Sequence, residues 1–523
     1  MTERGYSGRG ATPSRRHFVG GAAAGAMALL APRAAFAQEG DVVQTRAGRV
    51  RGLSENGVQV FRGIPYGAPT GGARRFLAPE PPAPWSGVRD ATRYGAIAPQ
   101  LGASGEQSED CLVLNVWTPA TGGDARRPVM VWVHGGGFAV GSGADPVTEG
   151  ARLAARNDVV VVSLNHRLNA LGYLYFGDLV PAGKAVANPG QLDVAAALLW
   201  VRDNIAAFGG DPDTVMVFGH SGGGSKVASL AAMPAAQGLF HRAALQSGFG
   251  TYGVAPDEGM RITLALFAAL GIARGDIDAL RAVPVPRLLT GLQQVTKGNP
   301  MLGPGIVADG TVLPHIPFAP DAPPIRPDLP MLVGHTATET TVLFPPPGAF
   351  ALDWAGLPGA LAGKVRDPAP MIDGFRRLRP GASPSDLYFA ITTEAGMGRN
   401  ARIVLEKRGA MGAALAYGYL VDWRSPVDGG RLRSHHGVEL PMVFDTVAAA
   451  PGIAPRAAEA QALAAIMSRR WATFARTGNP NVAGLPDWPA YAAPARATMI
   501  FDSPCSVRDD PLGAEQALVA AHA

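Results

Sequence analysis

A serine flanked by small residues follows a short apolar run near the middle of the chain. Gly219-His220-Ser221-Gly222-Gly223 fits the pattern G-x-S-x-G, comes directly after Val215–Phe218, and is followed by a helix-like stretch, Lys226–Ala232. A serine on such a strand-to-helix turn is exposed above a sheet edge, and the strained turn requires neighbours without large side chains. The pattern predicts that Ser221 is the nucleophile of an acyl-transfer enzyme.

A phosphate-binding loop is the main competing interpretation of these glycines. In that loop the lysine follows the second glycine directly, because its ammonium group must reach the phosphates that the backbone cradles. Here Ser225 stands between Gly224 and Lys226. The spacing therefore excludes the phosphate-loop interpretation.

A second run of glycines, His134-Gly135-Gly136-Gly137-Phe138, closes the apolar stretch Val129–Val133. Acyl transfer develops negative charge on the carbonyl oxygen of the substrate, and this charge needs rigid N–H donors. Consecutive glycines allow the backbone to approach that oxygen closely. The alternative is a flexible glycine turn, but next to a serine elbow the run favours an oxyanion site.

Short apolar runs rich in β-branched residues indicate the strands that would position these segments. The runs are 129–133, 159–164, 215–218, 330–334 and 414–420. Such continuous runs are typical of central strands covered on both faces. A helical pattern from Leu192 to Ile205 separates the second and third runs. Alternation of strands and helices predicts a mostly parallel central sheet with helices on both faces.

The remaining segments are expected to surround this sheet. Asp41–Phe61 alternates short apolar runs with glycine and predicts a small antiparallel sheet at the start. The long stretches 253–300 and 345–430 are expected to be helical and loop insertions. We find no linker after Gln38 and therefore expect one domain over residues 38–523.

The first 37 residues are typical of an export signal. Ser14-Arg15-Arg16-His17-Phe18-Val19 resembles a twin-arginine motif, a weakly apolar run from Val19 to Leu30 follows, and Ala35-Phe36-Ala37 fits a peptidase site before Gln38. The run is too short to span a bilayer as a stable helix. We expect an exported protein, periplasmic or secreted, with no stable membrane anchor after cleavage; the alternative is an ordinary tail that contains two arginines.

Charge and cysteine content narrow the class of protein further. The chain carries a formal charge of +4, but residues 1–37 hold five arginines and one glutamate, so the remainder is neutral. A neutral protein is not a polybasic binder of nucleic acid. With only Cys111 and Cys505, a disulfide-rich scaffold is excluded, and we expect two free, buried thiols. Histidine and cysteine spacings show no zinc pattern.

Ordered matches to one family extend over nearly the whole chain. They include Phe61–Tyr66, Arg75-Phe76, Ser108–Val116, Asn165–Leu168, Phe208–Pro212, Phe240–Ala243, Gln246–Gly248, Asp309-Gly310, Phe474-Ala475 and Gly478–Asn481. On these matches the chain resembles the carboxylesterase/cholinesterase family, the type-B carboxylesterases. The resemblance implies the α/β-hydrolase fold and a Ser-Glu-His order for the catalytic triad.

The resemblance also assigns the two partners of the nucleophile. The acid segment, usually G-x-x-x-D-E-G, reads Gly334–Thr340 here and gives Glu339 the acid position, although both flanking residues are threonine. The base motif H-G-x-E reads His436-Gly437-Val438-Glu439, which selects His436 over its neighbour His435. The alternative for Glu339 is a surface carboxylate, and the alternative for His436 is a structural histidine. The implied oxyanion donors are the N–H groups of Gly136, Gly137 and Gly222.

Two departures from the family lie beside the nucleophile. His220 replaces the usual glutamate and Gly222 the usual alanine. His220 could titrate near neutral pH, or it could be buried and hydrogen-bonded.

Two further features concern the region before Cys111. In the family, the cysteine at this position usually forms a disulfide with one upstream. Here Ala98 stands in that place and the loop to Cys111 is short. It lacks the aromatic residue that binds choline in cholinesterases, so choline esters are not expected as preferred substrates. The resemblance also implies a structural ion pair between Arg75 and Glu109.

Together these features predict a serine carboxylesterase that acts on a small-molecule ester without a metal or organic cofactor. His436 would take the proton of Ser221, Glu339 would orient and stabilise the histidine, and water would then release the acyl group. Two alternatives use the same fold: a non-catalytic binding protein, or an amidase, lactonase or acyltransferase with the same triad. The sequence leaves a monomer and a homodimer equally open.

Overall fold

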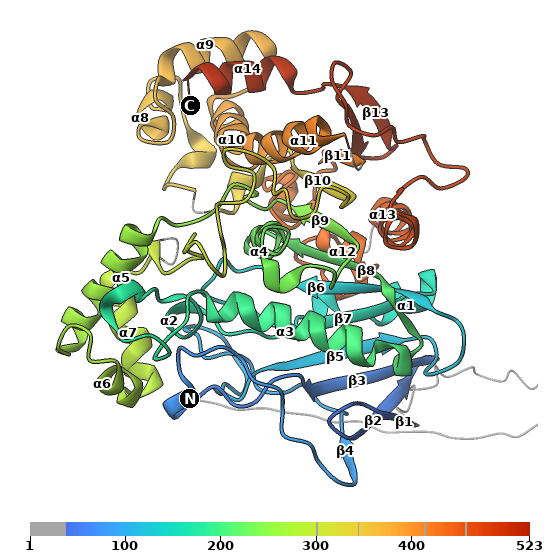
Figure 1. Ribbon diagram of the computed structural model, residues 1–523. Helices are drawn as coiled ribbons and strands as arrows, with labels where there is room; N and C mark the ends of the chain where they lie inside the picture. Colours follow the sequence, from blue (N-terminus) through green and yellow to red (C-terminus); the bar gives the residue numbers. More distant parts are fainter. Residues whose placement is uncertain (1–37, 300–301, 344, 413–414, 456–457, 523) are drawn as a thin grey trace, which may run out of the picture. The chain divides into compact units, whose positions relative to one another are not determined.

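One large sheet organises the protein in the computed structural model, which describes residues 38–299, 302–343, 345–412, 415–455 and 458–522 (Figure 1). Within these residues the sheet has thirteen strands in the order β1-β2-β3-β5-β7-β6-β8-β9-β10-β11-β12-β13, with β4 paired to β2. The predicted export signal, 1–37, lies outside the described residues.

The centre of the sheet is parallel, as predicted. Its strands are β7 (Val160–Leu164), β6 (Arg127–Val133), β8 (Gly210–His220), β9 (Arg242–Gln246), β10 (Met331–Thr336), β11 (Ala416–Val421) and β12 (Ala497–Phe501). The five apolar runs of the sequence all fall in this set. β8 begins five residues before its predicted apolar run, at Gly210, and reaches the residue before Ser221. The carboxyl ends of β8, β10 and β11 therefore share one edge of the sheet.

Antiparallel strands flank this parallel centre. β1 (Gln38–Gln44), β2 (Arg49–Glu55) and β3 (Val58–Pro65) form the predicted N-terminal antiparallel unit. The unit is continuous with the main sheet, because β3 pairs with β5 (Val113–Thr118) and β5 pairs with β7. β4 (Val88–Asp90) adds to β2, and β13 (Ser506–Asp509) closes the opposite edge.

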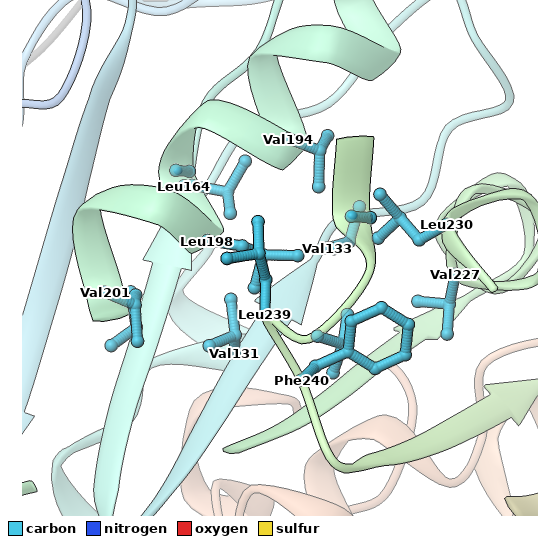
Figure 2. Close-up of a cluster of buried hydrophobic side chains, with 14 of the residues drawn as sticks. Val131, Val133, Leu164, Val194, Leu198, Val201, Val227, Leu230, Leu239 and Phe240 are labelled. Atoms are coloured by element: carbon cyan, nitrogen blue, oxygen red, sulfur yellow. The ribbon is translucent and has the colours of Figure 1, made fainter. Parts of the chain in front are cut away.

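Side chains alternate along β6 between two cores, because successive residues of a strand point to opposite faces. One face packs against α3 (Pro189–Asn204) and α4 (Gly222–Leu230). The labelled members of this core lie between the sheet and these helices (Figure 2): Val131, Val133, Leu164, Val194, Leu198, Val201, Val227, Leu230, Leu239 and Phe240. Burial of these apolar side chains anchors α4, and with it the residue at its start.

The other face carries larger side chains from the same strands. Met130 and Trp132 of β6 and Phe218 of β8 pack there with Trp471 of α13 (Ala458–Thr477). Residues of α1 (Ala151–Asn157) and α12 (Leu440–Val443) join this core. Loss of one such aromatic side chain costs about 3–5 kcal/mol. Helices therefore cover both faces, as the apolar strands require.

The two predicted insertions are largely helical. The first holds α5 (Pro256–Leu270), α6 (Ile277–Ala282) and α7 (Val285–Val295). The second holds α8 (Leu357–Leu361), α9 (Pro368–Leu378), α10 (Pro384–Thr393) and α11 (Arg399–Met411), and α14 (Gly513–His522) packs on α9. In the part of the chain that the structure describes, no helix is long and apolar enough to cross a membrane.

Arg75 ties the first insertion to the loop before Cys111. Its guanidinium group forms the predicted ion pair with Glu109, at 2.6 Å between Nη2 and Oε2. The same group donates hydrogen bonds to the carbonyl oxygens of Arg281 and Val283, at the end of α6. Both cysteines are free, as expected; Cys111 is buried, whereas Cys505 is only half-buried.

Candidate active site

Ser221 occupies a sharp turn between β8 and α4. Its backbone has φ 56° and ψ −125°, a conformation that few non-glycine residues adopt and that often marks a functional site. Its N–H donates to the carbonyl oxygen of Gln246 on β9, at 2.8 Å, and its carbonyl accepts from Ser225 N–H in the first turn of α4. The predicted nucleophile therefore lies on an anchored strand-to-helix elbow.

Close contacts explain the glycines around this elbow. A Cβ atom at Gly223 would lie 2.1 Å from the carbonyl oxygen of Val133, and one at Gly219 would lie 2.5 Å from the Gly223 carbonyl carbon. Any larger side chain would push α4 away from β6 and β8. The G-x-S-x-G pattern is therefore a packing requirement of the turn as well as a marker of the nucleophile.

The glycine run after β6 lies against the elbow, as predicted. A Cβ atom on Gly135 would be 3.5 Å from that of Ser221. Gly136 and Gly137 have φ values of +84° and +62°, which favour glycine. Within the described chain, the N–H groups of Gly136, Gly137 and Gly222 donate to no protein acceptor. Three N–H groups beside Ser221 thus remain available for a substrate oxygen.

Glu339 is fully buried just after β10, which rules out the surface-carboxylate alternative. It accepts hydrogen bonds from Thr336 N–H at 2.7 Å, from Ser247 Oγ at 2.6 Å and from Nδ1 of His436. Burial alone would raise the pKa of Glu339, but the charge of His436 and these hydrogen bonds lower it to about 2. The carboxylate is therefore ionised at neutral pH and can hold one tautomer of the His436 ring.

His436 is the histidine that meets this acid, as its motif predicts. Its side chain is 9% exposed, so the ring is nearly buried. The rival His435 instead directs Nδ1 to the carbonyl oxygen of His436, 3.0 Å away. The sequence motif, rather than mere proximity in the chain, selects the correct histidine.

Thr338 stands directly before the acid, where the family usually has an aspartate, and makes two hydrogen bonds there. Its N–H and its Oγ1 both donate to the carbonyl oxygen of Ser434, at 3.1 and 2.9 Å. Ser434 in turn donates from Oγ to the carbonyl oxygen of Val421, at the end of β11. The threonine therefore ties the acid segment to the segment that carries His436.

The structure brings the predicted residues to one place on the sheet edge. The ring of His436 lies 4.2 Å, centroid to centroid, from the ring of His220, the residue before Ser221. Among the described residues, no hydrogen bond joins Ser221 Oγ to His436. Contacts of this kind are often long until substrate binds. The arrangement can support proton transfer from a serine, provided that the hydroxyl group rotates toward the ring.

His220 is buried, and its pKa lies well below 6.5 because burial and the charge of His436 both disfavour its protonation. The expectation that it could titrate near neutral pH is therefore wrong. The alternative is a buried and hydrogen-bonded ring. The ring is buried, but its Nε2 has no hydrogen-bond partner in the described residues. His220 contributes a neutral ring beside His436.

Three residues of the site have no role assigned from sequence. Ser247 donates a hydrogen bond to Glu339, and Lys226 donates one to a carbonyl oxygen of the glycine loop. Glu439 is buried near His220. Ser247 and Glu439 lie inside matched motifs, so their positions carried a signal without a role. Within the described residues, no group of three or more His, Cys, Asp or Glu side chains is placed to hold a metal ion.

Comparisons with known proteins place this geometry in context. The sequence model of the carboxylesterase family matches residues 39–346 and 385–517 of this chain. The para-nitrobenzyl esterase of Bacillus subtilis (strain 168) is 37% identical over 494 residues, which cover 90% of this chain and 96% of that protein. The phenmedipham hydrolase of Pseudarthrobacter oxydans is 35% identical over 480 residues, or 88% and 94% of the two chains.

Solved structures agree with these relatives. The crystal structure of a Geobacillus stearothermophilus carboxylesterase at pH 6.2 superimposes with a TM-score of 0.83 at 38% identity. The match covers 91% of this chain and 99% of that one.

Proposed function

The chain belongs to the carboxylesterase family, and relatives such as the para-nitrobenzyl esterase are named as esterases; we propose that it hydrolyses carboxylic esters through an acyl-enzyme on Ser221. The observation that carries the assignment of residues is the buried bond from His436 to Glu339, located where the strained Ser221 elbow and the glycine loop meet. A binding protein without activity would not need to retain a strained serine, an ionised buried acid and a paired histidine.

Each group has a defined task in the reaction. His436 takes the proton from Ser221 Oγ as the oxygen attacks the ester carbonyl, and Glu339 stabilises the imidazolium that forms. The N–H groups of Gly136, Gly137 and Gly222 bind the oxyanion. His436 then passes the proton to the leaving alcohol, and water releases the acid by the same route. The protein's own residues supply each of these groups.

A largely apolar pocket beside the oxyanion loop supports a preference for neutral esters. It has a volume of about 210 Å³, and its lining includes Leu101, Ala139, Val140, Leu289 and Leu292 together with the uncharged polar side chains of Asn169, Gln293 and Thr296. The name of one relative, para-nitrobenzyl esterase, points to a substrate with an aromatic ring. We propose short-acyl aryl and benzyl esters as substrates and do not expect choline esters to be preferred.

Hydrolysis of 4-nitrophenyl butyrate by the purified protein tests this proposal. We expect Ser221→Ala to lower kcat/KM by at least about a thousandfold, because triad members act as a unit. Labelling with a fluorophosphonate should modify Ser221 and no other residue. Retention of activity by Ser221→Ala would refute the assignment. A parallel panel of amides, lactones and acyl acceptors distinguishes the other reactions available to the same triad.

We also propose that the chain is exported through the twin-arginine route and cleaved before Gln38. The proposal is supported by Arg15-Arg16, the short apolar run that follows, and Ala35-Phe36-Ala37. Expression in a bacterial host, followed by fractionation and N-terminal sequencing, should yield a periplasmic or secreted protein that starts at Gln38. Arg15→Lys together with Arg16→Lys should retain the protein in the cytoplasm. Export of that double variant would contradict the proposal.

A further inference from the structure

Lys226 lies wholly inside the protein, in the first turns of α4. The whole residue is 0% exposed. Its Nζ donates a hydrogen bond of 2.6 Å to the carbonyl oxygen of Gly137 and lies 5.0 Å from the centre of the Phe138 ring. Both partners belong to the oxyanion loop. In the described residues this is the single hydrogen bond that the ammonium group makes.

No carboxylate compensates this cation. In the part of the chain that the structure describes, no ion pair involves Lys226, and burial lowers its pKa to about 7. The nearby rings of His134 and His166 stack on one another, and burial together with the charge of Lys226 lowers the pKa of each, that of His134 to about 3. An unpaired buried cation destabilises a fold. Packing alone does not explain its presence, since methionine would fill similar space without the charge.

The position of the Gly137 carbonyl explains what the lysine holds. Gly137 adopts φ +62°, so its peptide planes have alternatives that a glycine can reach easily. The carbonyl is turned toward the elbow, where a Cβ atom on Gly222 would lie 2.3 Å from its oxygen. Lys226 and Gly222 therefore contact the same oxygen. One donates to it, and the other leaves the room that it needs.

We propose that Lys226 is a positioning residue of the oxyanion site. Its hydrogen bond to the Gly137 carbonyl oxygen fixes the peptide group between Gly137 and Phe138. This anchors the end of the glycine loop and limits rotation at Gly137, so that the preceding N–H groups of Gly137 and Gly136 stay directed at the ester carbonyl oxygen at Ser221. This inference rests on the esterase function proposed above. The bond is made before substrate binds, so the donors need no reorganisation as charge develops on the oxygen.

A purely structural lysine would behave differently on mutation. Loss of positioning removes stabilisation of the transition state, which lowers kcat and leaves KM nearly unchanged. Loss of a structural contact lowers the melting temperature instead. Arg408 is the matched control, because it is also a buried cation that donates to a backbone carbonyl, that of Leu329, outside the site.

The experiment compares the wild-type chain with Lys226→Met, Lys226→Gln and the control Arg408→Met. Three quantities are measured for each: kcat and KM on 4-nitrophenyl butyrate, Ki of a butyl trifluoromethyl ketone, and the melting temperature. The ketone is attacked by Ser221 and forms a hemiketal whose oxyanion occupies the proposed site. It therefore reports on that site without turnover.

We expect Lys226→Met to lower kcat by about 10- to 100-fold and to change KM by less than about threefold. Its Ki for the ketone should rise by the same factor as kcat falls. Its melting temperature should equal or exceed that of wild type, since the buried charge is gone. Lys226→Gln, which keeps a donor, should lie between the two, and Arg408→Met should leave kcat and the Ki of the ketone unchanged.

Several results would overturn the inference. Unchanged kcat and Ki in a folded Lys226→Met protein would do so, as would a loss of kcat that only follows a lower melting temperature. Failure of both Lys226 variants to fold would show that the residue holds the fold and not the site. A wild-type protein that neither cleaves the ester nor binds the ketone would instead refute the esterase function itself.

Discussion

Nε2 of His220 lies 3.8 Å from Oε1 of Glu439, and both side chains are buried. This distance is too long for a hydrogen bond. Burial and the nearby charge of Glu339 raise the pKa of Glu439 to about 7. The family resemblance implies two glutamates at these positions. Here Glu439 is kept but its pKa is raised, and the neutral ring of His220 takes the place of the other glutamate, which reduces negative charge beside His436.

The raised pKa of Glu439 predicts an unusual dependence of stability on pH. The folded protein keeps a proton on Glu439 up to about pH 7, whereas the unfolded chain loses it near pH 4.5. The free energy of unfolding therefore falls between pH 4.5 and pH 7, by up to about 3 kcal/mol. Glu439→Gln should remove this loss. Denaturation at pH 5 and pH 8 should show that Glu439→Gln gains more free energy of unfolding over the wild type at pH 8 than at pH 5. An equal gain at both pH values would contradict the assignment. Glu106→Gln, at an exposed position, is the control.

Glu339→Gln should leave the protein folded but nearly inactive. The amide cannot stabilise the imidazolium and can bind the wrong tautomer of His436, so kcat should fall by about 10⁴-fold. Because the pKa of Glu339 is lowered to about 2, its contribution to stability is complete above pH 4.5 and is lost as pH falls toward 2. Kinetics at pH 7.5 and acid unfolding together check both parts. Substantial activity in this variant would exclude Glu339 as the acid.

Ser247→Ala should weaken the site without abolishing it. The serine donates a 2.6 Å hydrogen bond to the charged Glu339, and loss of such a bond costs about 1.5–3 kcal/mol. We expect the melting temperature to fall and kcat to decrease far less than in Glu339→Gln. Ser247→Thr, which keeps the hydroxyl group, should recover part of the loss. An alanine variant indistinguishable from wild type would show that the bond has no energetic role.

Gly222→Ala introduces the residue that the family usually has at this position, and we expect it to impair this protein. The new methyl group would meet the Gly137 carbonyl oxygen at 2.3 Å, well inside contact distance. Either the oxyanion loop or α4 must shift, so kcat should fall by about 10-fold or more. Gly359→Ala, at an exposed position of α8 with no atom within 4 Å of the new methyl group, is the control. Full activity in Gly222→Ala would show that the loop yields freely.

The sequence was sufficient to predict the parallel sheet, its covering helices, the elbow that carries Ser221 and the pairing of His436 with Glu339. Apolar runs define central strands locally, and the motifs around Ser221 and His436 decide which serine and which histidine belong to the site. The relationship of Lys226 to Gly137 escaped prediction because the two residues are 89 positions apart and neither has a pattern that names the other. The continuity of the N-terminal strands with the sheet was missed for the same reason, since the pairing of β3 with β5 is a long-range contact.

The assembly of the triad from distant segments has a consequence for how the protein folds. His436 and Glu339 are 97 residues apart in the chain, and Ser221 lies farther upstream, directly after β8. They come together only when β9, β10 and β11 have paired in order beside β8. Parallel pairings of this kind form slowly, because the entropy of closing long loops is lost before contacts compensate it. A partly folded chain is therefore catalytically silent, and the first appearance of turnover during refolding marks the completed sheet rather than the initial collapse.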